Sequence, residues 1–259
     1  MTQEAVQTLE KSTMLNKPKS LTNLHWWRKA QRARPFTDNH KNLGLHLKYS
    51  AVLTLHGMLL NENSMWSEAR EVLKKALVIR EKLLCPNNIY TARTTAALGM
   101  AEYQLGKKYK GKRLLRKAAT MTNMSNQFNP RHYLGAYVHL TYVQVLTEDR
   151  NLQEAAKQAK NAIECIDYAC QTDIHPTVAE CHMLLAKINE IQDNVSEQRH
   201  HLIKACNTYD SLIWRETQYC KKQGLDPSKI KHLITWKKIK LECEQTASYI
   251  SPRAEHVDL

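Results

Sequence analysis

Residues 66–76 of this chain read WSEAREVLKKA, and three later stretches of equal length repeat the pattern. Each stretch ends on an alanine, and these alanines recur at Ala76, Ala118, Ala162 and Ala205. An apolar or small residue stands three positions before each alanine. The position seven residues before each alanine holds, in order along the chain, Ala69, Gly111, Ala155 and Gln198. This spacing places the small and apolar residues on one stripe of a helix. The repeated stretches are KYKGKRLLRKA (108–118), LQEAAKQAKNA (152–162) and VSEQRHHLIKA (195–205).

A second small position lies about nineteen residues upstream of each closing alanine. It is filled by Gly57, Gly99, Thr141 and Ala186, each beside or close to a leucine. Small side chains let two helices approach closely, so each unit is predicted to be two antiparallel helices that meet at these positions. Gln198 departs from the pattern and predicts looser packing in the fourth unit. The expected pairs are 47–62 with 65–84, 88–105 with 108–124, 131–147 with 152–171, and 176–192 with 195–223.

This order of small and apolar positions resembles the tetratricopeptide repeat. The period of about 43 residues exceeds that family's usual length and is similar to the longer kinesin-light-chain-type repeats, in which a segment such as His175-Pro176-Thr177-Val178-Ala179 opens a unit. The resemblance covers roughly residues 47–213. It implies an all-α, right-handed α-solenoid of about four helix pairs, with partner binding by the concave groove.

The segments outside the repeats have distinct expected roles. Residues 1–46 form a basic N-terminal arm, partly helical or extended, that precedes the solenoid of residues 47–224. Gly224 is a natural C-cap glycine, and Asp226 with Pro227 is a helix-start signal. A capping helix is therefore predicted over 225–250, where it would cover the end of the stack. The tail 251–259 is predicted to be disordered. The apolar residues that the cap offers for this contact are Ile230, Leu233, Ile234, Ile239 and Leu241.

Composition narrows the class of protein. Only 7 Gly and 7 Pro occur in 259 residues, which favours long regular helices. The seven cysteines are odd in number and scattered, which favours reduced thiols in the cytoplasm over a secreted disulfide framework. Neither a secretory leader nor an apolar run of about 20 residues for a membrane span is recognised in the sequence. The net charge of +13 favours an acidic partner.

The groove expected from the resemblance is lined by the first helix of each pair. Residues extrapolated from the small positions combine methionine and tyrosine with basic and amide side chains, which suit a peptide with apolar anchors and acidic groups. The alternative is a purely structural role, in which several of these residues pack on the neighbouring helix. The expected groove residues are Met58, Asn61, Arg93, Met100, Tyr103, Gln104, Tyr142 and Lys187, with Val138, Val145, Met183 and Glu190 beside them.

Basic side chains gather in three clusters, which either meet an acidic protein or nucleic acid, or form solvated helix faces. The first has adjacent indoles, which cannot both lie on one helix stripe, so one of them is expected to contact a partner. The contact residues expected in the first two clusters are Trp26, Trp27, Arg28, Lys29, Arg32, Arg34, Lys107, Lys108, Lys110 and Lys112. The third comprises Lys221, Lys222, Lys229, Lys231, Lys237, Lys238 and Lys240, with Trp236.

Catalytic and metal chemistry have no recognisable motif. Cys165, Cys170, His175, Cys181 and His182 fall within eighteen residues, but their spacing matches no zinc pattern, so the cysteines are interpreted as core thiols. We therefore expect no cofactor, no metal and no enzymatic activity. The leading hypothesis is a cytoplasmic adaptor or scaffold that binds a peptide or helix of a partner in a multiprotein assembly, by analogy cytoskeletal or ciliary. The alternative is an RNA- or DNA-binding helical-repeat protein that uses its basic faces.

Overall fold

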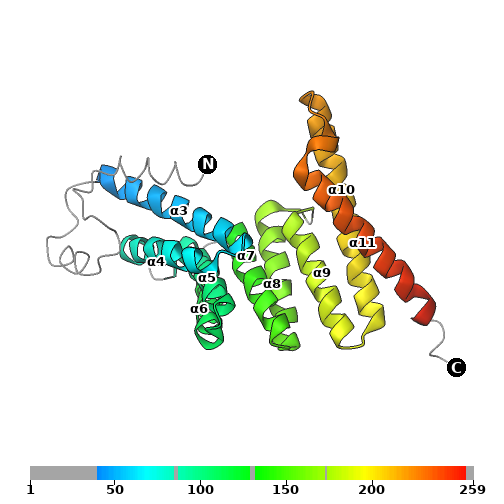
Figure 1. Ribbon diagram of the computed structural model, residues 1–259, viewed down its shortest axis with the longest axis horizontal. Helices are drawn as coiled ribbons and strands as arrows, with labels where there is room; N and C mark the ends of the chain where they lie inside the picture. Colours follow the sequence, from blue (N-terminus) through cyan, green and yellow to red (C-terminus); the bar gives the residue numbers. More distant parts are fainter. Residues whose placement is uncertain (1–39, 85–86, 129–131, 173, 255–259) are drawn as a thin grey trace. The chain divides into compact units, whose positions relative to one another are not determined.

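The computed structural model describes residues 40–84, 87–128, 132–172 and 174–254, and all regular structure in these ranges is helical (Figure 1). The chain divides into two compact units, residues 1–125 and 126–259. The first contains α3 (His40–Glu62), α4 (Trp66–Leu83), α5 (Ile89–Gln104) and most of α6 (Lys108–Phe128). The second contains α7 (Tyr133–Glu148), α8 (Leu152–Cys170), α9 (Pro176–Ile191), α10 (Val195–Lys222), the short 3-10 helix η1 (Pro227–Lys229) and α11 (Lys231–Ala254).

The first unit is two helix pairs that meet at small residues, as the sequence predicted. A Cβ added at Gly57 in α3 would lie 2.4 Å from Cγ of Leu73 in α4. In the next pair, a Cβ at Gly111 in α6 would lie 2.7 Å from the backbone oxygen of Gly99 in α5. At residue 111 only glycine permits this approach without a shift of the opposing backbone, whereas at residue 57 an added Cβ would displace the Leu73 side chain. The small residues of the repeat therefore determine where the paired helices come into close contact.

The second unit contains two further helix pairs and a terminal helix. Helices α7 and α8 pack together, as do α9 and α10, and α11 lies against α10. The repeat alanines Ala155, Ala162 and Ala205 are fully buried. Gln198, the departure from the pattern, is half-buried. Leu202, Cys206, Cys243 and Ala247 form the core that joins α10 to α11.

Caps and turns recur with the same period as the core. The side chains of Asn88, His132 and His175 each accept a hydrogen bond from the backbone two residues on, at the starts of α5, α7 and α9. Between the helices of each pair, one residue adopts a left-handed conformation two positions before the second helix begins. The following amide bonds back to the first helix, as in a Schellman motif. These left-handed residues are Ser64, Gly106, Arg150 and Asp193.

The helix ends differ from expectation at the two extremes of the array. Helix α3 begins at His40, seven residues before the expected start of the first pair. The Asp226 signal starts only the turn η1, because Ile230 is extended, and α11 then runs from Lys231 to Ala254, into the segment expected to be a tail. Gly224 adopts the expected left-handed conformation just after α10. None of the helices in the described ranges combines the length and apolar character needed to cross a membrane.

Candidate protein-interaction surfaces

Half of the expected groove residues of the first unit are buried. Asn61 donates a hydrogen bond from Nδ2 to the carbonyl oxygen of Ala97 at 2.9 Å, which ties α3 to α5. Met58 is buried, and Tyr103 exposes only 4% of its surface. Arg93 and Met100 are half-buried, and Gln104 is exposed. Helix α5 packs against both α3 and α4 and meets α6 at Gly99, so side chains on most of its circumference face neighbours. Gln104 is the fully accessible member of this set.

The same holds in the second unit. Tyr142 exposes 3% of its surface, and Val138 and Val145 are fully buried. Met183 packs on the core that joins α9, α10 and α11. Lys187 and Glu190 are exposed on α9. The accessible groove residues here are thus charged, and the apolar ones belong to the core.

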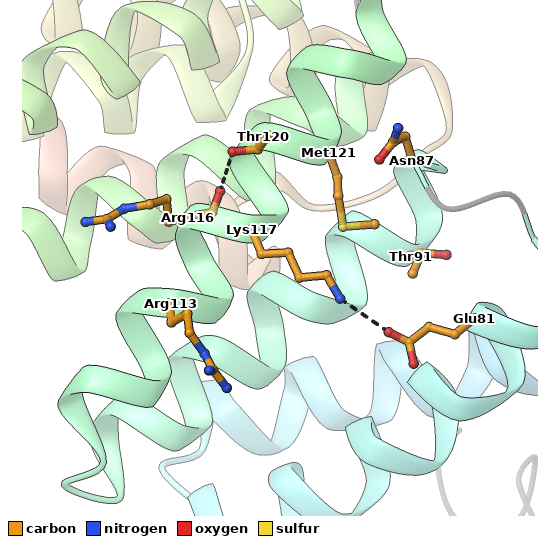
Figure 2. Close-up of a pocket in the computed structure, with 8 residues that line it drawn as sticks. All are labelled: Glu81, Asn87, Thr91, Arg113, Arg116, Lys117, Thr120 and Met121. Atoms are coloured by element: carbon orange, nitrogen blue, oxygen red, sulfur yellow. Dashed lines mark hydrogen bonds and ion pairs between the residues drawn. The ribbon is translucent and has the colours of Figure 1, made fainter.

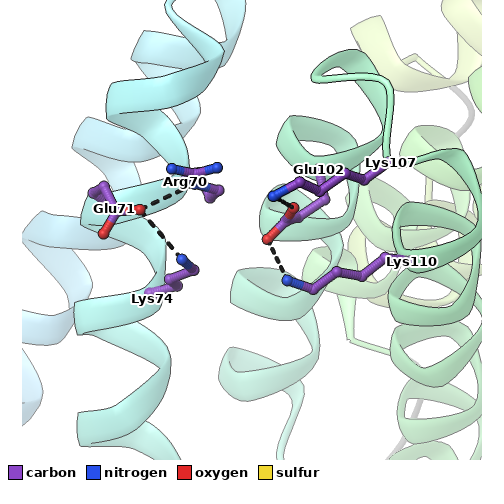
Figure 3. A network of polar contacts seen from close by, with 6 residues as sticks. All are labelled: Arg70, Glu71, Lys74, Glu102, Lys107 and Lys110. Carbon is purple, nitrogen blue, oxygen red and sulfur yellow. Dashed lines mark hydrogen bonds and ion pairs between the residues drawn. The ribbon is translucent and has the colours of Figure 1, made fainter. Parts of the chain in front are cut away.

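A buried carboxylate accounts for two of the expected basic contacts (Figure 3). Glu102 in α5 has no exposed side-chain surface, and its carboxylate oxygens lie 2.6 Å from Nζ of Lys110 and 3.7 Å from Nζ of Lys107. Burial raises the pKa of Glu102, but the hydrogen bond and charge of Lys110 and the charge of Lys107 outweigh it, so the pKa is lowered overall. Lys107 and Lys110 therefore serve this ion-pair network. Lys108 is exposed, with Nζ 5.7 Å from the centroid of the Tyr103 ring, and Lys112 is half-buried.

A pocket of about 630 Å³ opens beside the other basic residues of α6 (Figure 2). Arg113, Arg116 and Lys117 come from α6, and because they are spaced i, i+3 and i+4, they share one face of that helix. Nζ of Lys117 lies 3.5 Å from a carboxylate oxygen of Glu81 at the end of α4. The other lining residues are Asn87, Thr91, Thr120 and Met121. In the sequence these three cations are only the later members of the basic stretch 107–117, because the residues across the pocket come from other helices.

The end of the α10–α11 pair presents a surface that is both apolar and basic. Helix α10 has 28 residues and α9 has 16. The start of α9 packs near Tyr209 and Leu212, and the last part of α10 extends past it (Figure 1). We call this end of the pair the hairpin surface. It is formed by the exposed residues Trp214, Tyr219, Lys221, Lys222, Leu225, Lys229, Lys231 and Ile234.

Packing sorts the expected cap residues of α11 into two sets. Leu233 is fully buried and Ile239 packs on two core clusters, but Ile234 and Leu241 are exposed. These two lie seven residues apart on the outward stripe of α11. Lys240 is engaged, with Nζ 2.6 Å from Asp210 and 3.3 Å from Glu244. Trp236 is half-buried against the core formed by Tyr209 and Leu212.

The cysteine and histidine residues between 165 and 182 are dispersed by the fold. Cys165 and Cys181 lie in one hydrophobic core cluster, where burial raises the pKa of the Cys181 thiol, and Cys170 is exposed. His175 caps α9, and Nδ1 of His182 lies 3.1 Å from Nδ1 of His201. Within the described ranges, no group of three or more histidine, cysteine or acidic side chains is arranged to hold a metal ion.

The N-terminal contact residues lie outside the described residues. These are Trp26, Trp27, Arg28, Lys29, Arg32 and Arg34.

Comparison with known proteins establishes the fold. No family model and no curated protein matches the sequence. Among solved structures, BtubC (BKLC) from P. vanneervenii is similar over 99% of this chain and 93% of its own, with a TM-score of 0.57 and 10% identity. A putative kinesin light chain from Podosopora anserina, with nearly identical TPR-like repeats, is similar over 82% of this chain and 98% of its own. Its TM-score is 0.52 at 13% identity, and a single-residue variant of that protein gives 0.50 at 14%.

These likenesses confirm the resemblance on which the sequence prediction depended, at the level of the fold. The chain has an all-α helical-repeat fold of the tetratricopeptide-like kind.

Proposed function

We propose that this protein is a non-enzymatic adaptor that holds a segment of another protein, and that its hairpin surface makes the principal contact. The observation that carries the proposal is the exposure of Trp214 and Ile234, at 67% and 53% of their surfaces, among lysines. Tryptophan is the residue type most enriched at the energetic centres of protein interfaces. Large apolar side chains that gather at the end of a helix pair favour binding over simple solvation.

Charge specifies the kind of partner. Between Trp214 and Ile234 there are five lysine or arginine residues and two acidic residues. Both acidic residues are already engaged: Asp226 lies 3.8 Å from Lys229, and Glu216 lies 3.3 Å from Nε2 of His232. The remaining field is positive, so the surface suits an amphipathic segment that combines apolar anchors with acidic side chains.

The groove enters the proposal in a narrower form. In the first unit Gln104 is exposed, and in the second unit Lys187 and Glu190 are exposed; each unit would use its own residues for additional polar contacts with a partner. The cellular setting proposed here is a cytoplasmic assembly, and the kinesin-light-chain-like folds among the similar structures support a cytoskeletal one.

The proposal is tested with a double variant of the hairpin surface. Trp214→Ala with Ile234→Asp removes the indole and places an acidic group where the partner's acidic groups would lie. A matched control, Tyr109→Ala with Leu55→Asp, also removes one exposed aromatic side chain and replaces one exposed aliphatic side chain with an acidic one, but in the first unit. A protein captured from cell extract by the wild-type chain is purified and its affinity for all three chains is measured by titration calorimetry.

The hairpin variant is expected to lose at least about tenfold in affinity, whereas the control stays within about twofold of wild type. Equal losses in both variants would overturn the assignment of the surface. The same lysines and Trp214 suit stacking on single-stranded RNA, the alternative function. Binding of a 20-nucleotide oligouridylate that falls steeply with salt, and capture that ribonuclease abolishes, would replace the adaptor with a nucleic-acid-binding protein.

A further inference from the structure

We propose that the pocket between α4, α5 and α6 binds the phosphate of a phosphorylated serine or threonine in a protein partner (Figure 2). This inference rests on the proposed adaptor function, since it assumes that the ligand belongs to another protein. It concerns the first unit, whereas the hairpin surface belongs to the second, so each site can be tested without disturbing the other.

The first support is the set of cations on α6. Arg113, Arg116 and Lys117 all line the pocket from one helix face, and all three are exposed and so reachable by a ligand. Arginine presents a planar fork of donors that matches the oxygens of a phosphate in a bidentate manner. Two arginines and a lysine that line one cavity thus provide the positive charge and the donors for an anion with several acceptor atoms.

The second support is a buried hydroxyl in the pocket wall. Thr91 exposes 2% of its surface, and its Oγ1 has no hydrogen-bond partner among the described residues. Buried polar atoms are nearly always paired, so an orphaned hydroxyl that lines a pocket calls for a ligand. The hydroxyl is covered in the empty pocket, so a phosphate oxygen accepts from it once the Thr91 side chain turns toward the cavity. The side-chain amide of Asn87, in the same wall, supplies a further donor.

The net charge of the pocket lining favours a phosphate monoester over ligands with a single negative charge. Three cations and the carboxylate of Glu81 line the pocket, so the lining carries two more positive than negative charges. A monoester carries about −1.5 to −2 at neutral pH and offers three acceptor oxygens. A phosphodiester of RNA carries one negative charge and has two free oxygens, and a carboxylate carries one charge, so both would leave part of the field unmatched. The volume of about 630 Å³ also has room for the residues that flank a phosphorylated side chain, and the buried Met121 gives them an apolar wall.

When no ligand is bound, Glu81 pairs with one of the cations that line the pocket. Its carboxylate pairs with Lys117 at 3.5 Å, and both side chains are about half exposed. Ion pairs of this kind contribute little stability, so an incoming phosphate can take over Lys117. Because Glu81 would then repel the ligand, its neutralisation by Glu81→Gln should tighten binding. This sign distinguishes anion binding from a purely structural role for the pocket.

The experiment uses the full chain and a fluorescein-labelled heptapeptide of alanine and glycine with one central phosphoserine, followed by fluorescence anisotropy. The unphosphorylated peptide is its control. Arg113→Gln with Arg116→Gln is expected to weaken binding by at least about tenfold, because two charge-assisted contacts are lost. Glu81→Gln is expected to strengthen it by about threefold or more. Lys108→Gln, on the same helix but outside the pocket, should change it by less than about twofold.

The variant Thr91→Val distinguishes an effect on phosphopeptide binding from an effect on the stability of the fold. The variant keeps the shape of the side chain and removes a hydroxyl that has no partner among the described residues, so the melting temperature should stay or rise while phosphopeptide affinity falls about threefold or more. Equal binding of phosphorylated and unphosphorylated peptides would overturn the proposal. So would an oligouridylate that binds with the same sensitivity to the arginine variant. Either result leaves the hairpin surface and the adaptor function standing, because both are measured in the other unit.

Discussion

Gly57 and Leu73 touch across the first helix pair, and a double-mutant cycle on them measures how far the small repeat position determines the packing. A Cβ at residue 57 would lie 2.4 Å from Cγ and 2.6 Å from Cδ2 of Leu73. Contacts this short force Leu73 out of its place. Because Leu73 is fully buried, the displaced side chain has no solvent to enter.

The expected magnitudes follow from these contacts. Gly57→Ala should cost about 1–3 kcal/mol from overpacking, offset by about 1 kcal/mol of improved helix propensity. Leu73→Ala should cost about 2–5 kcal/mol, because it opens a cavity in the core. In the Leu73→Ala background the atoms that clash are gone, so Gly57→Ala should stabilise by about 1 kcal/mol through helix propensity alone. The coupling free energy between the two changes is therefore about 1–3 kcal/mol, favourable in the double variant.

The assay is urea denaturation followed by circular dichroism, with free energies compared at an unchanged slope. Gly44→Ala in the same helix is the matched control: a Cβ there meets nothing within 4 Å, so this variant should gain up to about 1 kcal/mol. If the two changes add to within about 0.5 kcal/mol, Gly57 and Leu73 do not share a tight contact, and the packing argument for all four units fails.

Two further predictions concern the core of the array and its response to acid. Ala118→Arg places a charge at a fully buried helix contact and should lower the stability by roughly 3–5 kcal/mol; an unchanged melting temperature would show a different register for α6. Acidification from about pH 7.5 to 5.5 should also destabilise the chain, because burial and His200, opposed by Glu197 and aided by Lys204 and Lys160, lower the pKa of His201 in the fold. The unfolded chain then binds the proton near pH 6.5, so this stability is complete above that pH and falls below it. His201→Gln should reduce the slope of melting temperature against pH without removing it, because burial also lowers the pKa of His46, His132 and His175; an equally steep slope would exclude His201.

The helices themselves could be predicted from the sequence because their determinants are local and repeated. Apolar and small residues at helical spacing specify the stripe that each helix buries, and four copies of the pattern confirm one another. Gly57, Gly99 and Gly111 then identify where paired helices touch, since a glycine inside a helix is unfavourable unless closeness requires it. Cap and turn residues were harder to read: three of the four left-handed turn positions are held by Ser64, Arg150 and Asp193, none of which announces that conformation.

The accessibility of side chains was decided only by the tertiary structure. Tyr103 and Tyr142 lie on the expected groove face, yet both are buried, because the first helix of a pair inside the array is packed by more than its own partner. Lys107 and Lys110 belong to a charge run in the sequence, but Glu102, from the preceding helix, draws them into an ion-pair network. The pocket beside Arg113 and the orphaned hydroxyl of Thr91 depend on three helices at once. A periodic pattern determines which face of a helix is buried, whereas a site depends on distances between residues of different helices, and only packing sets those.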